Sequence, residues 1–204
     1  MRGGLVLAGG LSTRMGVRKS FLTFDGEPFI AIIVGTLLKV VDEVVVAVGF
    51  RDDPSTHRRV LPASVRVIKD EVEGQSPLIG IITGLSQMRS TYVAMLSCDL
   101  PFAKAQILEY LFKKAHGFDA AIPRWPDGSI EPLHAIYSVN TALDAARIAF
   151  SSGGLKSTDM IERLTRINYV DLDEIRPFDP QLLSFFNINT PQDLMEARKI
   201  ASKD

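Results

Sequence analysis

Cysteine is almost absent from this chain, and its scarcity excludes several kinds of protein. Cys98 is the only cysteine among 204 residues, so an intrachain disulfide and a four-cysteine zinc site are both impossible. A lone thiol is typical of a reducing compartment, and we expect a cytoplasmic location. The chain begins without the apolar core of a signal peptide, so we expect no secretory leader.

Long apolar runs and an excess of one charge are also missing. The longest apolar stretch, residues 29–41, is interrupted by Gly35, Thr36 and Lys39, and a membrane-spanning helix needs about 20 residues. The formal net charge is −1, whereas a nucleic-acid-binding protein normally carries a basic stripe. These absences predict a protein that binds neither membranes nor nucleic acid. Any anionic ligand must then be held by a local set of donors.

What the sequence does contain is a repeated alternation of short apolar runs with longer helical segments. Hydrophobic residues make up 46% of the chain, which is an ordinary globular composition. We expect strands at residues 4–8, 43–48, 65–69, 92–97, 119–123, 133–138, 167–171 and 185–188. We expect helices at residues 28–40, 54–61, 77–89, 103–116, 139–150, 155–164 and 191–202, and Pro28, Pro77 and Pro191 stand where a first-turn proline is tolerated.

The strand pattern predicts the fold class. Most expected strands are continuous apolar runs, as at residues 44–48, and strands buried on both faces have this composition. We therefore predict a single-domain α/β three-layer sandwich over residues 1–204, with a mostly parallel sheet and helices on both faces. Ligands of such sheets bind at the carboxyl ends of the strands. The loops of interest follow Ala8, Val48, Lys69, Ser97, Pro123 and Ile188.

The loop after the first expected strand is rich in glycine and reads LAGGLSTRMGVRK. Gly9 and Gly10 have no side chains, so phosphate oxygens can approach their backbone N–H groups closely. Ser12 adds a hydroxyl donor, and Arg14 and Lys19 add positive charge that can neutralise a triphosphate. The composition of this loop predicts phosphate binding. A plain Gly-Gly turn flanked by solvated cations is the structural alternative.

Two better-known phosphate-binding loops have different spacings. A P-loop has four residues between its glycines and then Lys followed at once by Ser or Thr. Here five residues separate Gly10 from Gly16, and two more stand before Lys19. The dinucleotide signature G-x-G-x-x-G is also absent from this loop. The spacing therefore excludes both motifs.

An acidic residue follows the apolar run at residues 92–97. Asp99 is expected to project from the carboxyl edge of the sheet toward the glycine-rich loop. Mg²⁺ is commonly bound by one or two carboxylates together with water and phosphate oxygens, so Asp99 is a candidate metal ligand. The alternative is that Asp99 caps the helix expected after Pro101. Its neighbour Cys98 is expected to fill the core.

The glycine-rich loop resembles the L-A-G-G-x-S-x-R-M-G-x-x-K signature of the small nucleotidyltransferases that include molybdenum cofactor guanylyltransferase. The resemblance implies a Rossmann-like nucleotide-diphosphosugar transferase fold, in which this loop surrounds the base and triphosphate of the donor. Arg18 is a departure, because the family commonly has aspartate there. The loop residues implied to bind GTP are Leu7, Ala8, Gly9, Gly10, Ser12 and Lys19.

Other segments resemble further elements of the same family. The string C-D-L-P resembles the family's C-D-x-P element, which implies that Asp99 binds the metal and contacts the nucleotide. Asp70 matches a strand-end aspartate that contacts the nucleotide. Ser76 replaces the first glycine of the family's G-P-L-A-G element.

The last such element is N-x-N-T-P-x-D-L, which begins at Asn187. It offers the side-chain oxygen of Asn189 as a second magnesium ligand. Alternation along the expected strand would put Asn187 on the same side. The alternative is that Asn189 or Thr190 simply caps the helix that begins at Pro191.

The acceptor side is predicted from weaker signals. The string E-P-L-H-A-I-Y, which begins at Glu131, resembles a strand that lines the acceptor site in this family. His134 within it is either a packed, hydrogen-bonded residue or an acceptor contact. Trp125 is a candidate for stacking on a flat acceptor. Residues 153–157 are a candidate acceptor-phosphate site at a helix start.

Together these features predict magnesium-dependent nucleotidyl transfer. An acceptor phosphate oxygen would attack the α-phosphorus of GTP, and pyrophosphate would leave. An anionic acceptor needs no general base, which agrees with the absence of a Ser-His-Asp or Cys-His arrangement. Arg14 and Lys19 would neutralise the triphosphate and Asp99 would place the metal, so catalysis would depend on positioning and charge.

The resemblance implies GTP as donor, because cytidylyl relatives typically read L-A-A-G, and molybdopterin as acceptor. It also implies transient contacts with other cofactor-biosynthesis proteins, while the sequence indicates no oligomeric state. The alternatives are a molybdopterin cytidylyltransferase, a sugar-1-phosphate nucleotidyltransferase and a non-catalytic nucleotide-binding assembly module. A pure binder needs no metal site, so the joint presence of Arg14, Lys19, Asp99 and Asn189 favours an enzyme.

Overall fold

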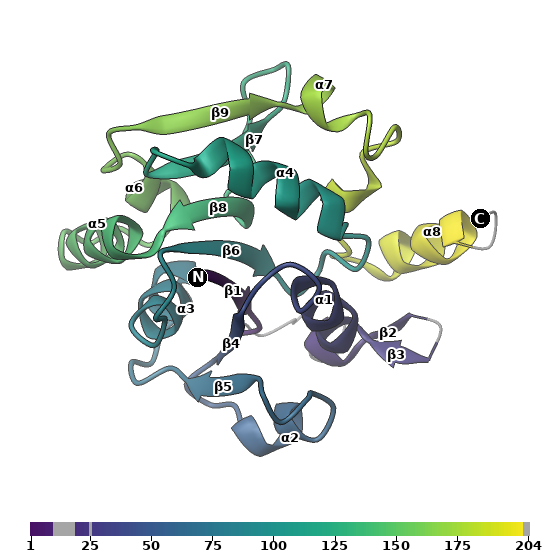
Figure 1. Ribbon diagram of the computed structural model, residues 1–204. Helices are drawn as coiled ribbons and strands as arrows, with labels where there is room; N and C mark the ends of the chain where they lie inside the picture. Colours follow the sequence, from purple (N-terminus) through teal and green to yellow (C-terminus); the bar gives the residue numbers. More distant parts are fainter. Residues whose placement is uncertain (10–18, 25, 202–204) are drawn as a thin grey trace.

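A central β-sheet organises the molecule (Figure 1). The computed structural model describes residues 1–9, 19–24 and 26–201. Its strands are β1 (Arg2–Leu7), β2 (Thr23–Phe24), β3 (Glu27–Pro28), β4 (Glu43–Val48), β5 (Arg66–Lys69), β6 (Tyr92–Ser97), β7 (Ala120–Arg124), β8 (His134–Ser138) and β9 (Ile167–Asp171). Within the described residues, seven of these strands form one sheet in the order β5-β4-β1-β6-β8-β7-β9, and β2 pairs with β3 separately.

The sheet is mostly parallel, as predicted. Only β8, among the described strands of this sheet, runs antiparallel to its neighbours β6 and β7. A short loop without a helix connects β7 to β8, and parallel neighbours would need a longer crossover connection. In β4, Val44 and Val46 enter one core while Val45 enters the other. Its continuous apolar run therefore reflects burial on both faces.

Helices cover both faces of this sheet. They are α1 (Phe29–Leu37), α2 (Pro54–Arg58), α3 (Pro77–Leu85), α4 (Ala105–Ala115), α5 (Val139–Ser151), α6 (Ser157–Ile161), α7 (Leu172–Ile175) and α8 (Pro191–Ala201). Helices α1 and α4 bury side chains in one core, and α3, α5 and α6 bury theirs in the other. Figure 1 shows these two groups of helices on opposite faces of the sheet. The predicted α/β three-layer sandwich is confirmed. None of the described helices is long and apolar enough to cross a membrane.

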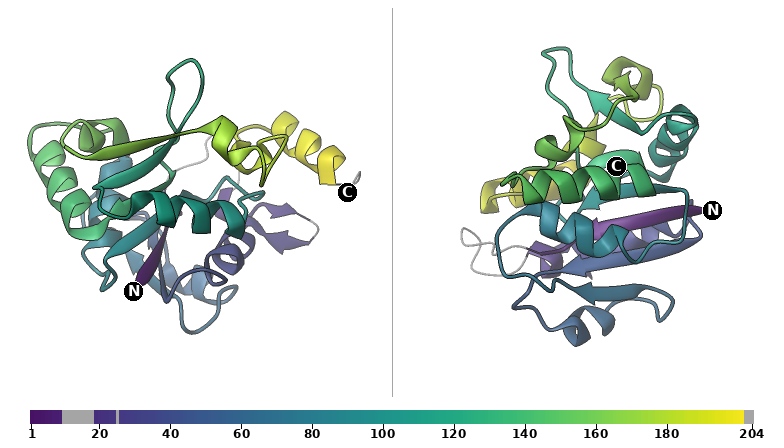
Figure 2. Two further views of the ribbon diagram at one scale, coloured as in Figure 1. Left: turned by 45° about the horizontal axis from the view of Figure 1, so that its top comes forward. Right: turned by 90° about the vertical axis from the view of Figure 1, so that its left-hand side faces the viewer.

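A third, smaller cluster joins the two ends of the chain. Leu22 and Phe29 from the N-terminal part pack with Ile188 and with Ala197 of α8. In Figures 1 and 2, α8 accordingly lies at the same end of the molecule as the β2–β3 hairpin. This packing brings the segment that follows the glycine-rich loop next to the segment that precedes α8.

The strand predicted at residues 185–188 is wrong. The chain there forms a short 3₁₀ helix, Leu183–Phe185, and then continues without pairing in the sheet. Ile188 and the nearby Ser184 explain the difference, because loops and side chains satisfy their polar groups in place of a neighbouring strand. The N–H of Ile188 donates to the carbonyl of Asp99 at 3.0 Å. The backbone N–H, hydroxyl and carbonyl of Ser184 bond respectively to Asp179 (2.7 Å), Phe102 (3.0 Å) and His134 (3.0 Å).

Several predicted helices are shorter than expected. The first begins at Phe29 and not at Pro28, because Pro28 belongs to β3 and the N–H of Phe29 bonds to Leu22 at 2.8 Å. The helix predicted at residues 155–164 is confined to Ser157–Ile161. The β2–β3 hairpin and α7 were not predicted, because such short elements show no periodicity.

Candidate active site

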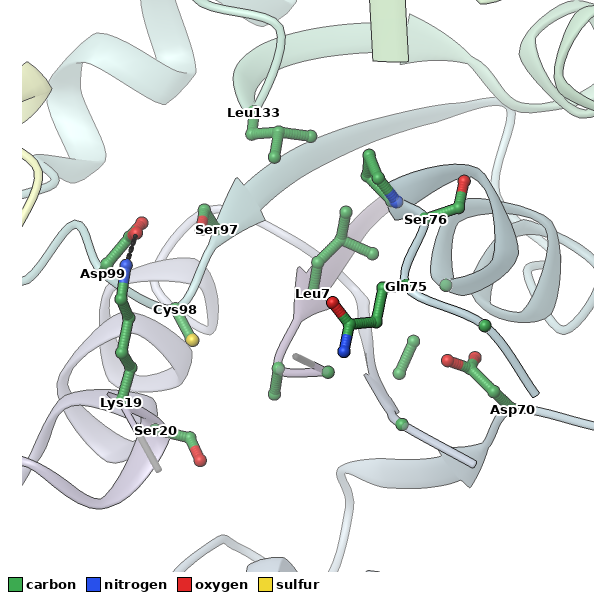
Figure 3. Close-up of a pocket in the computed structure, with 17 residues that line it drawn as sticks. Leu7, Lys19, Ser20, Asp70, Gln75, Ser76, Ser97, Cys98, Asp99 and Leu133 are labelled. Carbon is green, nitrogen blue, oxygen red and sulfur yellow. Dashed lines mark hydrogen bonds and ion pairs between the residues drawn. The ribbon is translucent and has the colours of Figure 1, made fainter. Parts of the chain in front are cut away.

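A pocket of about 340 Å³ opens at the carboxyl edge of the sheet (Figure 3). The ends of β1, β4, β5 and β6 and the start of α3 surround it. This is the edge at which parallel α/β sheets bind ligands. Six residues predicted from the sequence line the pocket: Leu7, Ala8, Gly9, Lys19, Asp70 and Asp99. Three other predicted residues, Gly10, Ser12 and Arg14, lie outside the described residues.

Lys19 is the centre of a polar cluster at one end of the pocket. Its ammonium donates a hydrogen bond to Oδ2 of Asp99 at 2.9 Å and another to the side-chain oxygen of Asn189. Figure 3 shows the first of these contacts. Lys19 begins a 3₁₀ helix whose next residue, Ser20, is buried, so its backbone is well anchored. Residues from three distant parts of the sequence therefore meet at one point.

Asp99 is held at the edge of the sheet and not at a helix start. Its carbonyl accepts a hydrogen bond from the N–H of Ile188 at 3.0 Å. The following helix, α4, has Lys104 as its N-cap residue, so the alternative that Asp99 caps this helix is wrong. The side chain of Asp99 is 12% exposed, and its Oδ1 is buried with no hydrogen-bond partner within the described part of the chain. Leaving a buried carboxylate oxygen without a hydrogen bond costs free energy, so a bound cation or hydrogen-bond donor would be favourable here.

Thr190, and not Asn189, caps helix α8. The hydroxyl of Thr190 accepts a hydrogen bond from the N–H of Asp193 at 3.2 Å, and Oδ2 of Asp193 accepts from the N–H groups of Asn189 and Thr190 at 2.8 Å each. This reciprocal arrangement is a capping box. It leaves the side chain of Asn189 available to the Lys19 ammonium. The amide of Asn187 instead donates to a carbonyl of its own segment, at 3.3 Å.

The donor set at this end of the pocket fits a hard divalent cation. It combines the unpartnered carboxylate oxygen of Asp99 with the amide oxygen of Asn189. No group of three or more His, Cys, Asp and Glu side chains that could hold a metal occurs among residues 1–9, 19–24 and 26–201. A cation here would therefore complete its coordination with ligand oxygens and water, which is how Mg²⁺ is usually bound beside phosphates.

Asp70 lies across the pocket from Asp99 (Figure 3). It follows β5, and its N–H donates to the carbonyl of Val48 at 2.9 Å. Burial raises the pKa of the Asp70 carboxyl, and the nearby charge of Asp52 raises it further. Oδ1 of Asp70 is buried and, within the described residues, accepts no hydrogen bond. The pocket thus has an unsatisfied carboxylate oxygen at each end.

Gly9 allows two loops of the pocket to pack closely. A Cβ atom at this position would lie 3.1 Å from the backbone nitrogen of Gly49, which follows β4. A side chain on Gly9 would require the backbone at Gly49 to shift slightly. The absence of a side chain at Gly9 therefore also serves backbone packing, and the approach of phosphate oxygens to this turn stays a prediction.

Some lining residues were not predicted from the sequence. Gln75 and Ser97 both face the pocket. Ser97 is the last residue of β6, so the rule that ligands bind at strand ends provided a signal for it. Ser76, which replaces a family glycine, is the N-cap residue of α3, and its hydroxyl accepts from the N–H of Leu78 at 3.2 Å.

Two predictions for the acceptor side are resolved by the structure. His134 is fully buried, its Nδ1 bonds to the carbonyl of Ser184, and burial lowers its pKa to about 4. It is a packed residue of the core. The phosphate site predicted at residues 153–157 is wrong, because the N–H groups of Leu155 and Lys156 already donate to the carboxylate of Asp159 at 2.8 and 2.9 Å.

The sheet order, the pocket at its carboxyl edge and the Lys19–Asp99 pair are those of an α/β protein that binds a ligand at the ends of its parallel strands. The family model for the MobA-like NTP transferase domain matches residues 4–166. The chain belongs to this family.

Individual relatives resemble the chain over almost its whole length. Two proteins named "Probable molybdenum cofactor guanylyltransferase" are similar to it. The one from Methanosarcina mazei is 38% identical and covers 95% of this chain and 88% of its own. The one from Natronomonas pharaonis is 36% identical and covers 97% of each. The crystal structure of molybdopterin-guanine dinucleotide biosynthesis protein A from Archaeoglobus fulgidus has a TM-score of 0.83 at 31% identity, covering 99% of this chain and 100% of its own.

Proposed function

We propose that this chain transfers GMP from GTP to the phosphate of molybdopterin and releases pyrophosphate, which forms the guanine dinucleotide cofactor. The main support is the pocket, which combines an unsatisfied carboxylate at one end with a lysine–carboxylate–amide cluster at the other. The choice of donor and acceptor is supported by the names of two relatives. The match to this chain spans 88% of the length of one and 97% of the length of the other.

The donor nucleotide would lie along the pocket. Its nucleoside end would face Asp70, whose buried Oδ1 can accept a hydrogen bond from a hydroxyl or N–H group. Its phosphates would face Lys19 at the other end. Gly10, Ser12 and Arg14 are proposed as further phosphate donors on the sequence resemblance alone.

Lys19 would stabilise the negative charge that develops on the departing pyrophosphate. Its ammonium is held by Asp99 and Asn189 before any ligand binds. A positively charged donor that is already in place loses little free energy to reorganisation during the reaction.

We further propose that the oxygens of Asp99 and Asn189 hold Mg²⁺. The bound ion would supply neutralisation of the triphosphate charge. Asp99 provides the carboxylate oxygen that has no partner among the described residues, and Asn189 provides a neutral oxygen. The Lys19 ammonium contacts Oδ2 of Asp99 and the side-chain oxygen of Asn189, so the ammonium and the ion would lie next to each other and both face the phosphates.

The reaction forms one bond and breaks one bond at the α-phosphorus. An oxygen of the acceptor phosphate forms the new P–O bond, and the bond to the bridging oxygen of the β-phosphate breaks with its electron pair. The attacking oxygen is already anionic, so no proton must be removed. Two buried groups near the pocket are poor alternatives as nucleophile or base. Burial raises the pKa of Cys98 to about 12, and His134 is enclosed in the core.

Pyrophosphate release tests the proposed function. The purified protein is incubated with molybdopterin, GTP and Mg²⁺, and the experiment is repeated with CTP and with EDTA in place of the metal. We expect release with GTP and Mg²⁺ and a large loss under either change. Equal release with CTP would contradict the assignment of the donor. GTP binding without release under any condition would favour the non-catalytic binding module.

A further inference from the structure

The carboxyl edge of the sheet continues beyond the nucleotide pocket. The groups assigned to the nucleotide follow β5 and β1, and Asp99 follows β6. Next along the same edge come the start of β8 and the end of β7. Leu133, just before β8, lines the pocket, and its carbonyl accepts a hydrogen bond from the N–H of Ser97 at 3.0 Å. The β7–β8 loop therefore flanks Asp99 on the side away from the nucleotide.

This loop contains a fixed indole–carboxylate pair. Nε1 of Trp125 donates to Oε1 of Glu131 at 2.7 Å, and both residues are half-buried. The backbone N–H of Glu131 donates to the carbonyl of Pro123 at 3.0 Å, which holds the loop in a hairpin. The Trp125 ring also packs edge-on against Phe185 at 6.2 Å between centroids. The orientation of the Glu131 carboxylate is therefore set before any ligand binds.

The negative charge of Glu131 limits which groups of a ligand the β7–β8 loop can bind. Burial raises the pKa of the Glu131 carboxyl, and the charge of Asp99 raises it further. The loop that carries Glu131 reaches the same edge of the sheet as Asp99, because Leu133 lines the pocket and its carbonyl accepts from the N–H of Ser97. Among the described residues, Glu131 forms no ion pair with a lysine or arginine and accepts only the indole hydrogen bond. A second carboxylate near Asp99 would repel a phosphate. It would instead attract a neutral group with N–H donors.

We propose that Glu131 recognises the pterin ring of the acceptor, with Trp125 as the residue that positions it. A pterin presents a 2-amino group and a ring N–H side by side, and each carboxylate oxygen can accept more than one hydrogen bond. The acceptor phosphate would then face the Lys19 ammonium while the ring reaches the β7–β8 loop. This inference depends on the proposed function for its acceptor.

Direct binding of free pterin tests the inference without turnover. Pterin fluorescence is titrated with the protein in the presence of GTP, and lumazine serves as the matched ligand, because it has a carbonyl oxygen in place of the 2-amino group. We expect wild-type protein to prefer pterin. In Glu131→Gln the amide oxygen can still accept the Trp125 N–H, but the charge is lost. We expect this variant to bind pterin about tenfold to a hundredfold more weakly, which is the usual effect of a hydrogen bond to a charged group.

Control variants separate recognition from folding. Glu162→Gln removes an exposed carboxylate elsewhere, and we expect unchanged binding of both ligands. Trp125→Phe keeps an aromatic ring but removes the N–H donor, and we expect a smaller loss of pterin affinity than in Glu131→Gln. GTP affinity and the thermal midpoint should stay near wild type in Glu131→Gln. With molybdopterin as substrate, this variant should raise the KM for molybdopterin and leave the KM for GTP unchanged.

Each outcome has a distinct meaning. If Glu131→Gln binds pterin and lumazine as wild type does, or if wild-type protein does not prefer pterin, the inference is overturned and Glu131 only supports its hairpin. If the pterin preference depends on Glu131 but no pyrophosphate is released with any donor, the pterin site stands and the proposed transfer reaction fails.

Discussion

The ammonium of Lys19 donates a hydrogen bond to the side-chain oxygen of Asn189, although 170 positions separate the two residues in the sequence. The same ammonium donates to Asp99 at 2.9 Å. A buried cluster of Leu22, Phe29, Ile188 and Ala197 holds the two chain segments together. One lysine thus links the end of the glycine-rich loop to both oxygen ligands proposed for the metal.

Replacing Lys19 tests its proposed role in charge stabilisation. By comparison with the loss of one preorganised donor in other enzymes, Lys19→Ala should lower kcat by about 10²–10³. Lys39→Ala, which removes an exposed lysine just after α1, should leave kcat unchanged. The measurement is steady-state pyrophosphate release. A Lys19→Ala variant with nearly wild-type kcat would show that this ammonium does not act on the triphosphate.

The two asparagines of the C-terminal motif should differ in their effects. Asn189 contributes its oxygen to the cluster around Lys19, whereas the amide of Asn187 bonds to its own segment. We expect Asn189→Ala to raise the Mg²⁺ concentration needed for half-maximal turnover, and Asn187→Ala to change it little. Activity is measured over a range of Mg²⁺ concentrations. Identical curves for the two variants would rule out a specific metal-binding role for Asn189.

Two helical glycines should respond in opposite directions to alanine. A Cβ at Gly84 in α3 would lie 2.2 Å from Cδ1 of Leu5, which is fully buried. We expect Gly84→Ala to reduce the free energy of unfolding by about 1–3 kcal/mol through overpacking. Gly35 in α1 is exposed with open space around it, so Gly35→Ala should stabilise by roughly 0.5–1 kcal/mol. Urea denaturation measures both changes, and stabilisation by Gly84→Ala would contradict the described packing of α3 on β1.

His134 should make stability depend on pH in mildly acidic solution. Burial lowers its pKa from 6.5 to about 4 in the folded protein, so the unfolded chain binds a proton between these pH values while the folded protein does not. The contribution of neutral His134 to the free energy of unfolding is complete above pH 6.5 and is lost as the pH falls toward 4. The total loss is on the order of 3 kcal/mol.

The comparison with His134→Leu isolates this effect. From pH 7 to pH 5 the free energy of unfolding should fall more for the wild-type protein than for the variant, because leucine does not titrate. Urea denaturation at the two pH values measures it. A difference that is the same at both pH values would mean that His134 is not held neutral in the core.

Burial on both faces is what made much of the fold predictable. The bounds of β4 follow directly from the apolar run at Glu43–Val48, since almost every side chain in it lies in a core. Residues 185–188 are also mostly apolar but form no strand. There the bonds of Ser184 to distant parts of the chain decide the conformation. Such tertiary contacts leave no local periodicity.

The site was predictable where motif residues sit at strand ends. Asp70 and Asp99 both follow predicted strands, and both line the pocket. The contact between Lys19 and Asn189 was not predictable, because it depends on the packing of α8 against the N-terminal segment. The capping box at Thr190 shows a related limit. Its sequence alone left either Asn189 or Thr190 as the cap, and only the geometry assigns the role to Thr190.

The fate of the α-phosphate of GTP tests the central claim most directly. The protein is incubated with molybdopterin, Mg²⁺ and GTP labelled with ³²P at either the α or the γ position, and the products are separated. Nucleotidyl transfer predicts that the α label appears in the molybdopterin dinucleotide and that the γ label appears in pyrophosphate. Label from the γ position in molybdopterin, or α label recovered only as free GMP or GTP, would contradict it.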